Sequence, residues 1–468
     1  MPALPVMLLV VVVALPAFFN VGPLRLSPAR VLLLVMFFPA VMRWMKGPKV
    51  IADWLVLGYC LWTTLSLLIV HGAGEIWQFA GITFVEAFGA YMIGRAYIGG
   101  PADFSAFTRF FHKVLLVFAP MAMLEAVAGI RPLTMLFSPV FSTFWWAATG
   151  YEKRLGMSRA QVGFEHPILW GVYAATGFAL FFFARRASGA RGGAGYAAVS
   201  AVGTFFSLSM GGLINIVLQS GLIAYDYILR RNKDRWKLSL WLAAAAYVVV
   251  DLISNRNPFE VATTYLVFDS YTAYYRILIF QFGMDNVIAH PIFGIGLNDW
   301  ARPSWMPPSV DNFWLLTAMR GGVPAFLFLA FALILTVVRN GRRNILDPVA
   351  ADQRKALNFV LVGLGIAIST VHLWGGVYYH VMFLLGAAGW MQHFQGGDAG
   401  SPPPSGRAAR IGTGRRAPRG GAEDQAPAPA APPATLPVRP PRPGAPTPPG
   451  RDRPVRPARL PLGTGPRR

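Results

Sequence analysis

Two arginines lie in stretches of the sequence where a bare positive charge would be costly. Arg276 belongs to the apolar run AYYRILIF, and Arg159 follows Lys153 and Arg154 in YEKRLGMSRAQVGFEHP. A guanidinium among aromatic and aliphatic side chains is expensive to desolvate unless it meets an anion. Because its planar fork matches phosphate oxygens, we expect Arg159 and Arg276 to bind a phosphate group. The alternatives are a structural salt bridge for Arg276 and a solvated basic patch for Lys153 and Arg154.

A carboxylate could supply the acid–base chemistry. Asp311 and Asn312 stand where an apolar stretch begins, in PPSVDNFWLL. A carboxylate at such a boundary can have a raised pKa and act as a general base toward a sugar hydroxyl. The alternative for Asp311 is a helix N-cap. His290 and His166 each precede a proline and could also serve as bases, although both suit capping or packing at a helix end better.

Motifs of soluble enzymes are absent from the sequence. There is no phosphate-binding P-loop, no HExxH and no GxSxG, and Gly294-Ile295-Gly296 lacks the third glycine of a dinucleotide fingerprint. The single cysteine, Cys60, excludes a disulfide framework and a thiolate metal cluster, and we expect it to be a small buried hydrophobe. We therefore expect neither a cofactor nor a bound metal.

The elements that must position these residues are membrane helices. Of the 468 residues, 54% are hydrophobic and 13% are charged, a balance that a soluble domain could not cover with polar surface. The sequence predicts an all-α polytopic membrane protein, since a helix of roughly 20 apolar residues crosses the hydrocarbon core. About twelve spans are expected, near residues 4–20, 28–44, 51–70, 76–96, 107–128, 166–184, 194–209, 211–229, 238–253, 312–338, 356–374 and 376–394.

Lysines and arginines concentrate in alternate loops, which predicts the orientation. They occur near residues 43–49, 95–113, 185–191, 230–237 and 339–355, whereas the other short loops hold almost none. By the positive-inside rule, both termini are cytoplasmic in a bacterial inner membrane, and the loops 129–165 and 251–311 are periplasmic. This layout also explains the net charge of +21 without a nucleic-acid partner.

Two regions are expected: a transmembrane domain over residues 1–394 and a tail over residues 395–468. The tail is rich in Pro, Ala, Arg and Gly and has almost no large apolar residue, so it should be disordered and cytoplasmic. Its candidate role is weak electrostatic attachment to anionic lipid or to a partner, and the alternative is a solvated tail with no specific role. The long loop 251–311 has aromatic and β-branched residues that argue against disorder, and loops of this length are usually functional.

Three segments resemble the O-antigen ligase and polymerase family of integral membrane glycosyltransferases. His290-Pro-Ile-Phe-Gly-Ile-Gly-Leu-Asn298 is similar to a segment of the family's large periplasmic loop. Asp311-Asn-Phe-Trp-Leu-Leu followed by Gly321-Gly-Val-Pro is similar to the segment that leads into the next span, and Ser158-Arg159-Ala-Gln-Val-Gly-Phe-Glu-His-Pro167 to one before a middle span. The number of spans and the long loop between the ninth and tenth agree with the family.

The resemblance implies metal-independent transfer of a glycan from an undecaprenyl-diphosphate carrier to a sugar or lipid A-core acceptor, with membrane lipid and other polysaccharide-export proteins as candidate partners. Arg159 and Arg276 fall on the family's arginine positions, and His290, Asn298, Asn312 and Arg154 are candidate substrate-binding residues. Asp311 falls where the family usually has the histidine base, and Ser209-Met210-Gly211 lacks a customary arginine. A carboxylate can take the same proton.

Two readings from other classes stay open. A multi-pass transporter or flippase for an anionic lipid-linked solute would also use arginines that face a cavity. Against it, the sequence shows no repeated half and no pair of interrupted spans, and Glu86 and Glu125 are the main acids in the spans. The third reading is a structural subunit of an export complex. Ligase and polymerase share a donor and differ in the acceptor, so the sequence does not separate them.

Overall fold

A computed structural model of the chain describes residues 2–22, 24–74, 76–143, 153–187, 192–254 and 270–394. By its contacts the chain divides into two compact units, Met1–Ser401 and Pro402–Arg468. All the described residues belong to the first unit. The predicted disordered tail, residues 395–468, and parts of both predicted periplasmic loops, residues 144–152 and 255–269, lie outside the described residues.

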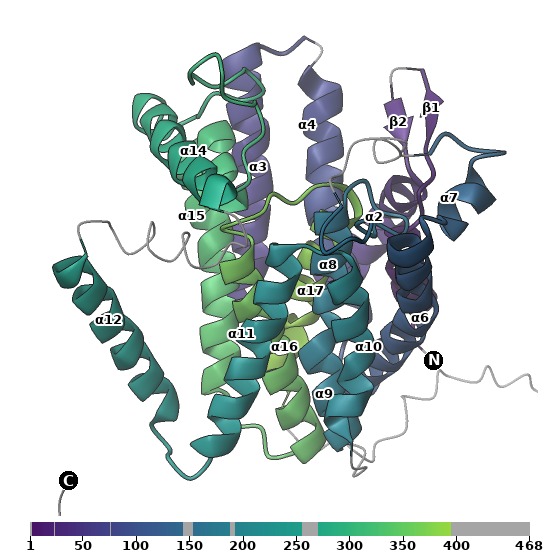
Figure 1. Ribbon diagram of the computed structural model, residues 1–468, viewed down its shortest axis with the longest axis vertical. Coiled ribbons are helices and arrows are strands. Elements are labelled where there is room, and N and C mark those ends of the chain that lie inside the picture. Colours follow the sequence, from purple (N-terminus) through teal and green to yellow (C-terminus); the bar gives the residue numbers. More distant parts are fainter. Residues whose placement is uncertain are drawn as a thin grey trace, which may run out of the picture. The chain divides into compact units, whose positions relative to one another are not determined.

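The first unit is a bundle of helices with one small hairpin (Figure 1). The hairpin pairs β1 with β2 in antiparallel register, Phe19 opposite Leu26. The elements are α1 (Leu4–Val12), β1 (Phe19–Val21), β2 (Leu24–Leu26), α2 (Pro28–Lys46), α3 (Ile51–His71), α4 (Ile76–Phe84), the π-helix η1 (Val85–Gly89), α5 (Ala90–Tyr97), α6 (Pro101–Ala128), α7 (Pro132–Phe137), α8 (Pro167–Ala175), α9 (Gly177–Ala187), α10 (Gly193–Phe206), α11 (Met210–Ile228), α12 (Arg235–Ile253), α14 (Ser270–Ala289), α15 (Phe313–Arg342), α16 (Pro348–Ala367), α17 (Gly375–Ala387) and the 3₁₀ helix η2 (Gly389–Gln392). The predicted all-α class is therefore confirmed for the described residues.

Every predicted span overlaps a helix, but the helices differ in length. Seven helical segments of the described chain are long and apolar enough to cross a membrane, namely Pro28–Lys46, Ile51–His71, Ile76–Tyr97, Pro101–Ala128, Pro167–Arg186, Arg235–Ile253 and Phe313–Arg342. The others are shorter or less apolar. The chain thus has the helices of a polytopic membrane protein, and the number of twelve spans stays a prediction.

The first expected span, 4–20, is helical only over its first half. α1 ends at Val12, and the chain then passes through Pro16 into β1. Proline has no amide hydrogen and disfavours helical geometry in the residue before it, so the hydropathy of this stretch overestimates the helix. The result is a nine-residue helix that is too short to span the hydrocarbon core.

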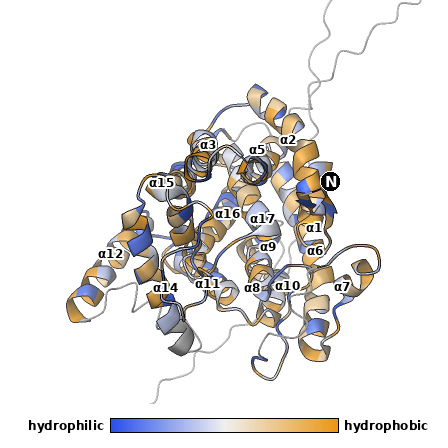
Figure 2. Cartoon of the chain, turned by 90° about the horizontal axis from the view of Figure 1, so that it is seen from above, coloured by the Kyte–Doolittle hydropathy of each residue, from blue (hydrophilic) through white to orange (hydrophobic). Residues whose placement is uncertain are grey.

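The core lies around α17, which is buried along most of its length and packs against α5. Figure 2, a view along the bundle, places α16 and α17 near its middle, while α12 and α7 lie at its edge with hydrophobic colours. α12 has no buried residue. Apolar side chains on the outside of a helix bundle are expected when the surrounding solvent is lipid.

A buried carboxylate, Asp53 of α3, ties three elements together. It accepts hydrogen bonds from Tyr91 Oη at 2.7 Å and Arg95 Nε at 2.9 Å on α5, and from Trp44 Nε1 at 2.9 Å on α2. Its own N-terminal turn adds the amide of Val50 at 2.9 Å. A buried charge with this many donors is compensated, so we assign Asp53 a structural role.

α15 is broken one third of the way along. Gly322 has φ = 74°, so the helix runs in two parts and Pro324 lies just inside the second. The segment that follows α14 fills the break: the amides of Ile295 and Gly296 donate to the carbonyls of Met319 at 2.7 Å and Arg320 at 3.0 Å. These bonds satisfy backbone carbonyls that the break would otherwise leave without partners.

The glycines of this segment have a physical reason. Gly294 and Gly296 have positive φ, 65° and 62°. A Cβ on Gly294 would lie 2.3 Å from the carbonyl oxygen of Met319, and one on Gly322 would lie 2.0 Å from that of Ile292. The segment His290–Asn298 therefore packs closely against the break in α15 and seals it. Only glycine permits this close approach of the two backbones.

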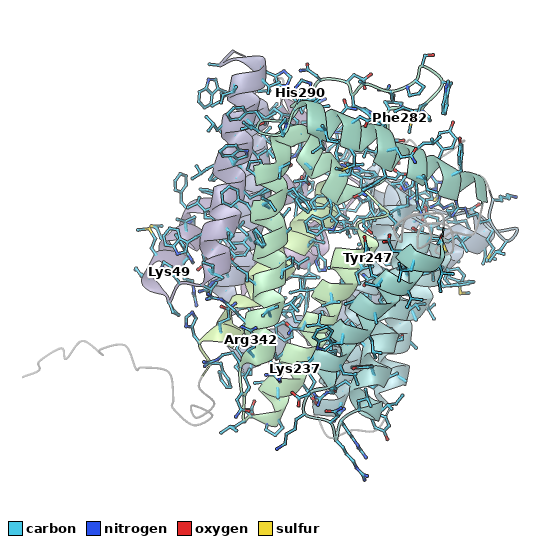
Figure 3. The ribbon with its side chains drawn as sticks, turned by 90° about the vertical axis from the view of Figure 1, so that its left-hand side faces the viewer. Lys49, Lys237, Tyr247, Phe282, His290 and Arg342 are labelled. Atoms are coloured by element: carbon cyan, nitrogen blue, oxygen red, sulfur yellow. The ribbon has the colours of Figure 1, made fainter. Side chains whose placement is uncertain are left out.

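The bundle has two ends that labelled residues distinguish. Figure 3 places Lys237 and Arg342 at one end and His290 at the other, where α14 crosses obliquely. We call these the basic end and the loop end. The loop end carries the sequence-predicted site residues.

Candidate functional site

Three arginines and one carboxylate, drawn from distant segments, come together at the loop end. Arg276 lies on α14, Asp311 just before α15, and Arg154 and Arg159 between α7 and α8. The charge of Arg276 acts on Asp311 and on Arg154, and Arg154 and Arg159 both act on His166. We call Arg154, Arg159, Arg276 and Asp311 the arginine–aspartate cluster. The structure thus places Arg276 near Asp311, whereas Arg159 is linked to this pair only through Arg154 and His166.

Arg276 is the unusual member of the cluster. It lies within α14, and its Nε and Nη1 atoms are buried with no hydrogen-bond partner among the described residues. Burial lowers the pKa of this guanidinium, and the opposite charge of Asp311 partly offsets that effect. A guanidinium remains charged in proteins, so these buried donors require an acceptor. An anionic ligand would supply it.

Asp311 is not the helix cap. The N-cap of α15 is Asn312, whose side-chain oxygen accepts the amide of Leu315 at 3.0 Å. The capping alternative for Asp311 is therefore wrong, because the cap lies one residue later. The Asp311 carboxylate makes no hydrogen bond with any described residue. Burial raises its pKa, opposed by the charge of Arg276, which is the environment that a general base requires.

Arg154 and Arg159 hold the turn between α10 and α11. Arg154 Nη1 donates to the carbonyl of Leu208 at 3.0 Å, and Arg159 Nε approaches the carbonyl of Ser207 at 3.5 Å. Leu208 has φ = 47°, a conformation that a leucine adopts only under constraint. This turn leads directly into Met210, the position where the resembled family has an arginine. Two arginines from another segment thus contact the backbone just before this position.

Glu125, near the end of α6, positions the segment that carries Arg159. Its Oε2 accepts the amide of Val162 at 2.7 Å, and its Oε1 pairs with Arg131 at 3.2 Å. Val162 has φ = 58°, which is rare for a β-branched residue and shows how firmly the segment is held. The sequence analysis noted Glu125 only as an acid within a span, whereas the structure gives it this anchoring role.

His166 caps α8, as the sequence analysis favoured. Its Nδ1 accepts the amide of Ile168 at 3.1 Å. Burial and the charges of Arg159 and Arg154 lower the pKa of His166 to about 4, so the ring is neutral at pH 7. A neutral ring whose Nδ1 accepts a hydrogen bond carries its proton on Nε2 and has no free nitrogen for a further proton. The geometry therefore disfavours His166 as the base.

The other candidate binding residues lie around the cluster rather than in it. His290 and Asn298 are exposed and belong to the segment that seals α15, where Asn298 donates its amide to Ile295 at 3.2 Å. Among the described residues, no interaction links either side chain to the cluster. Asn312 uses its oxygen as the cap. The predicted substrate contacts of these three residues stay predictions.

An apolar groove of about 730 Å³ begins at Asn312 and follows α15 toward the basic end. α14 and α16 form its other walls. Its lining includes Phe280, Met284, Trp314, Leu333, Val338 and Leu361. We call it the apolar groove. Its start, one residue from Asp311, places an apolar channel beside the arginine–aspartate cluster.

A second and larger cavity was missed by the sequence analysis. It measures about 880 Å³ and is lined by charged residues of α2, η1 and α15, among them Arg30, Glu86 and Arg320. We call it the charged cavity. Its sequence signal was the presence of charged residues inside expected spans, which usually marks a functional site. Only the fold shows that these charges share one space.

Comparison with known proteins adds no family to these observations. No family model matches the chain, and no curated protein matches it. Among the described residues, no group of three or more histidine, cysteine, aspartate or glutamate side chains could hold a metal ion.

Proposed function

We propose that the protein transfers a glycan from a polyprenyl-diphosphate carrier, of the undecaprenyl type, to a hydroxyl group of an acceptor sugar. One observation carries this proposal: a buried guanidinium with unused donors, Arg276, lies beside an unbonded carboxylate, Asp311, at the start of an apolar groove. An anion site, a base and a lipid site in one place are what this reaction needs. The motifs that resemble the O-antigen ligase and polymerase family support the same conclusion.

The charge of the cluster fits a diphosphate diester. Three arginines and one ionised carboxylate leave two positive charges, since His166 is neutral at pH 7. A diphosphate esterified at both ends carries two negative charges, and it gains a third when the glycan departs. Arginines aimed at the leaving oxygen bind the transition state more strongly than the ground state. In this proposal, Arg276 and Arg159 stabilise the departing diphosphate.

The apolar groove suits the carrier's hydrocarbon chain. It follows α15, a helix long and apolar enough to span a membrane, and its lining is almost entirely aliphatic and aromatic. A polyprenyl chain placed there would leave its diphosphate at the loop end beside Arg276. The lipid would bind through burial of apolar surface, and the headgroup through the arginines.

The chemistry then requires one proton transfer and one displacement. Asp311 accepts the proton of the acceptor hydroxyl as that oxygen attacks the anomeric carbon of the donor sugar. The bond between this carbon and the diphosphate oxygen breaks, and the electron pair stays with the diphosphate. Attack opposite the leaving group inverts the anomeric configuration. Asp311, whose pKa burial raises, is a stronger base than an exposed aspartate.

The proposed location is the outer face of a bacterial inner membrane, with both termini in the cytoplasm. The separation of Lys237 and Arg342 from His290 along the bundle (Figure 3) supports this orientation. The acceptor would be a sugar of a growing polysaccharide or of lipid A-core, so polymerase and ligase both remain within the proposal.

A transporter is the second candidate, because α15 is interrupted within an apolar span. Interrupted helices in transporters expose backbone groups to the substrate. Here the carbonyls at the break already bind the amides of Ile295 and Gly296, at 2.7 and 3.0 Å. The break is therefore filled by the chain itself, which favours the transferase.

Deletion of the gene in its native host tests the proposal. We expect loss of long glycan from lipopolysaccharide or secreted polysaccharide, restored by the wild type but not by Arg276→Ala or Asp311→Asn.

Purified Asp311→Asn protein should still bind the lipid-linked donor while turnover falls by about 10²-fold or more, as expected when a general base is removed. Lipopolysaccharide ladders separate the two acceptors, since a ligase defect removes all attached glycan and a polymerase defect leaves single repeats.

Matched variants control for expression and for charge. Asp285 is exposed on α14, the same helix as Arg276, and Arg231 is exposed at the basic end. Asp285→Asn and Arg231→Ala should both restore the glycan fully. An unchanged glycan profile in the deletion strain would refute the transferase. Substrate movement that persists in Asp311→Asn would instead favour the transporter.

A further inference from the structure

The charged cavity opens on the opposite side of α15 from the apolar groove. Phe313, Leu316, Thr317 and Arg320, spaced by three, four and seven residues, line the cavity. Trp314, Leu315 and Ala318 line the groove. One face of the first part of α15 thus borders each space, and Asp311 lies just before the helix, between them. A reaction that joins two substrates at Asp311 needs a binding site on each side.

Arg320, which lines this cavity, has no partner of opposite charge among the described residues. Arg30 forms an ion pair with Glu86 at 2.5 Å, and Tyr379 donates a hydrogen bond to the same carboxylate. Arg320 is exposed to the cavity, and its guanidinium makes no hydrogen bond or ion pair with any described residue. Its charge acts on Tyr59 and on His372, two side chains without a negative charge. An arginine held in this way within a membrane helix marks an anion site.

The remaining wall suits a sugar ring. Phe313, His372 and Trp374 form a stack of nearly parallel rings, with centroids 6.2 and 5.5 Å apart. All three line the cavity, and the buried Nδ1 of His372 has no hydrogen-bond partner among the described residues. Burial and Arg320 lower the pKa of His372 to about 3, so it remains neutral and can bond with a hydroxyl group. Apolar ring surface with a few polar groups is the usual lining of a small-molecule site.

The cavity is connected to the arginine–aspartate cluster through short stretches of chain. Glu165, which lines the cavity, precedes His166, and the His166 ring lies 6.0 Å from that of Trp374. On the other side, Phe313 follows Asp311 by two residues and docks on the α16–α17 turn through its amide. The residues that line the cavity therefore include close sequence neighbours of both His166 and Asp311.

We infer that the charged cavity binds the acceptor, and that this acceptor is a saccharide carrying an anionic group that pairs with Arg320. This ligand is an acceptor only if the protein transfers glycans as proposed above, so the inference rests on that function and adds the chemical class of the acceptor. The anion is a phosphate or a uronic acid carboxylate, since a guanidinium binds either in the same bidentate geometry. A cavity of about 880 Å³ is within the size range of sites that enclose small molecules.

Calorimetry on the full chain in lipid nanodiscs tests the inference without any turnover. The probes are digalacturonic acid, maltose 1-phosphate and neutral maltose. We expect the wild type to bind one anionic probe at least about tenfold more tightly than maltose, which is the usual contribution of a charge-assisted hydrogen bond. Preference for digalacturonic acid identifies a uronic acid acceptor, and preference for maltose 1-phosphate a phosphorylated one.

Variants locate the site. Arg320→Gln should remove the anion preference and leave maltose binding unchanged, whereas Arg231→Gln, exposed at the basic end, should behave as wild type. Thr317→Phe, which fills the cavity from the same helix face, should weaken all three probes. Equal binding of charged and neutral probes by the wild type would overturn the inference, as would an Arg320→Gln protein that keeps the preference.

The two proposals fail in different ways. Arg276→Gln should lose the lipid-linked donor but keep the anionic saccharide probe, and Arg320→Gln should do the reverse. If glycan is unchanged in the deletion strain while Arg320 still determines probe binding, the transfer function falls and the saccharide site stands. If transfer occurs and the anionic probes show no preference, the acceptor site is elsewhere.

Discussion

Asp311 is held in a state that lowers the stability of the fold. Burial raises the pKa of its carboxyl above the ordinary value, and Arg276 offsets this only in part. A carboxyl whose pKa is higher in the folded than in the unfolded state has no unfavourable effect on folding below its unfolded pKa, about 4, where both states are protonated. As the pH rises through the folded pKa, the free energy of unfolding falls. At neutral pH the ionised Asp311 therefore costs folding free energy, as active-site groups often do.

Removing the charge of Asp311 should therefore stabilise the fold at neutral pH. Asp311→Asn should raise the melting temperature by a few degrees at pH 7, and the gain should shrink to zero as the pH falls below about 4. The control is Asp285→Asn on exposed surface of α14, which should leave the melting temperature unchanged at every pH. Scanning fluorimetry across this pH range measures both. A variant that is less stable than wild type at pH 7 would show that the Arg276 pairing outweighs burial.

Individual residues show which parts of the candidate site the sequence could predict and which it could not. Arg159, Arg276 and Asp311 were identified because a charge in an apolar stretch and a resemblance to known motifs both pointed to them. The sequence analysis offered Asp311, rather than Asn312, as the N-cap of α15. The two residues are adjacent and chemically similar, so only the geometry distinguishes them. Arg30, Glu86 and Arg320 were missed as a set because they are far apart in the chain, and composition cannot show which charges share a cavity.

Among the elements, α15 determines the arrangement of both sites. Its first part separates the apolar groove from the charged cavity, and its break fixes where that part ends. The break exists because Gly322 adopts φ = 74° and the segment from Pro291 to Gly296 fills the gap. Trp62 of α3 adds a hydrogen bond to the carbonyl of Gly321 at 2.9 Å.

The second prediction concerns this seal. Gly322→Ala should destabilise the fold by roughly 2–4 kcal/mol, because an alanine is strained at positive φ and its Cβ would lie 2.0 Å from the carbonyl oxygen of Ile292. Gly221, inside α11 and open on its outer side, is the matched control, and Gly221→Ala should be neutral or slightly stabilising. Thermal unfolding of both purified variants, with glycan restoration in the deletion strain, provides the comparison. If the two variants were equally stable, the proposed close packing at Gly322 would be wrong.

Hydropathy predicted the helices well and their interruptions poorly. Apolar length alone requires a helix in lipid, so each expected span overlaps one. The break in α15 depends on a tertiary contact between residues 291–296 and 319–323, which no local pattern encodes. The same limit applies to α1, where Pro16 and the hairpin redirect an apolar stretch. The sealing role of the Gly294-Ile295-Gly296 segment could be recognised only from the fold.

The helix bundle has two ends with different residues. Lys237 and Arg342 lie at one end, and His290 and Phe282 of α14, the helix that carries Arg276, lie at the other. From the positive-inside rule we predict that the basic end faces the cytoplasm. The proposed reaction depends on this orientation, because a glycan-bearing carrier in the outer leaflet can reach Arg276 only if the loop end faces outward.

The single native cysteine makes this orientation testable. Cys60 is buried, at 2% exposure, and should not react with a maleimide that cannot cross membranes. Cysteines introduced at exposed positions report on the two ends, with Asn298→Cys at the loop end and Lys237→Cys at the basic end. In intact cells whose outer membrane has been permeabilised, we expect labelling of Asn298→Cys alone. After lysis both should label, and the parent chain should remain unlabelled throughout. Labelling of Lys237→Cys in intact cells would reverse the orientation and place the arginine–aspartate cluster on the cytoplasmic side, where the proposed carrier would have to present its glycan from the opposite leaflet.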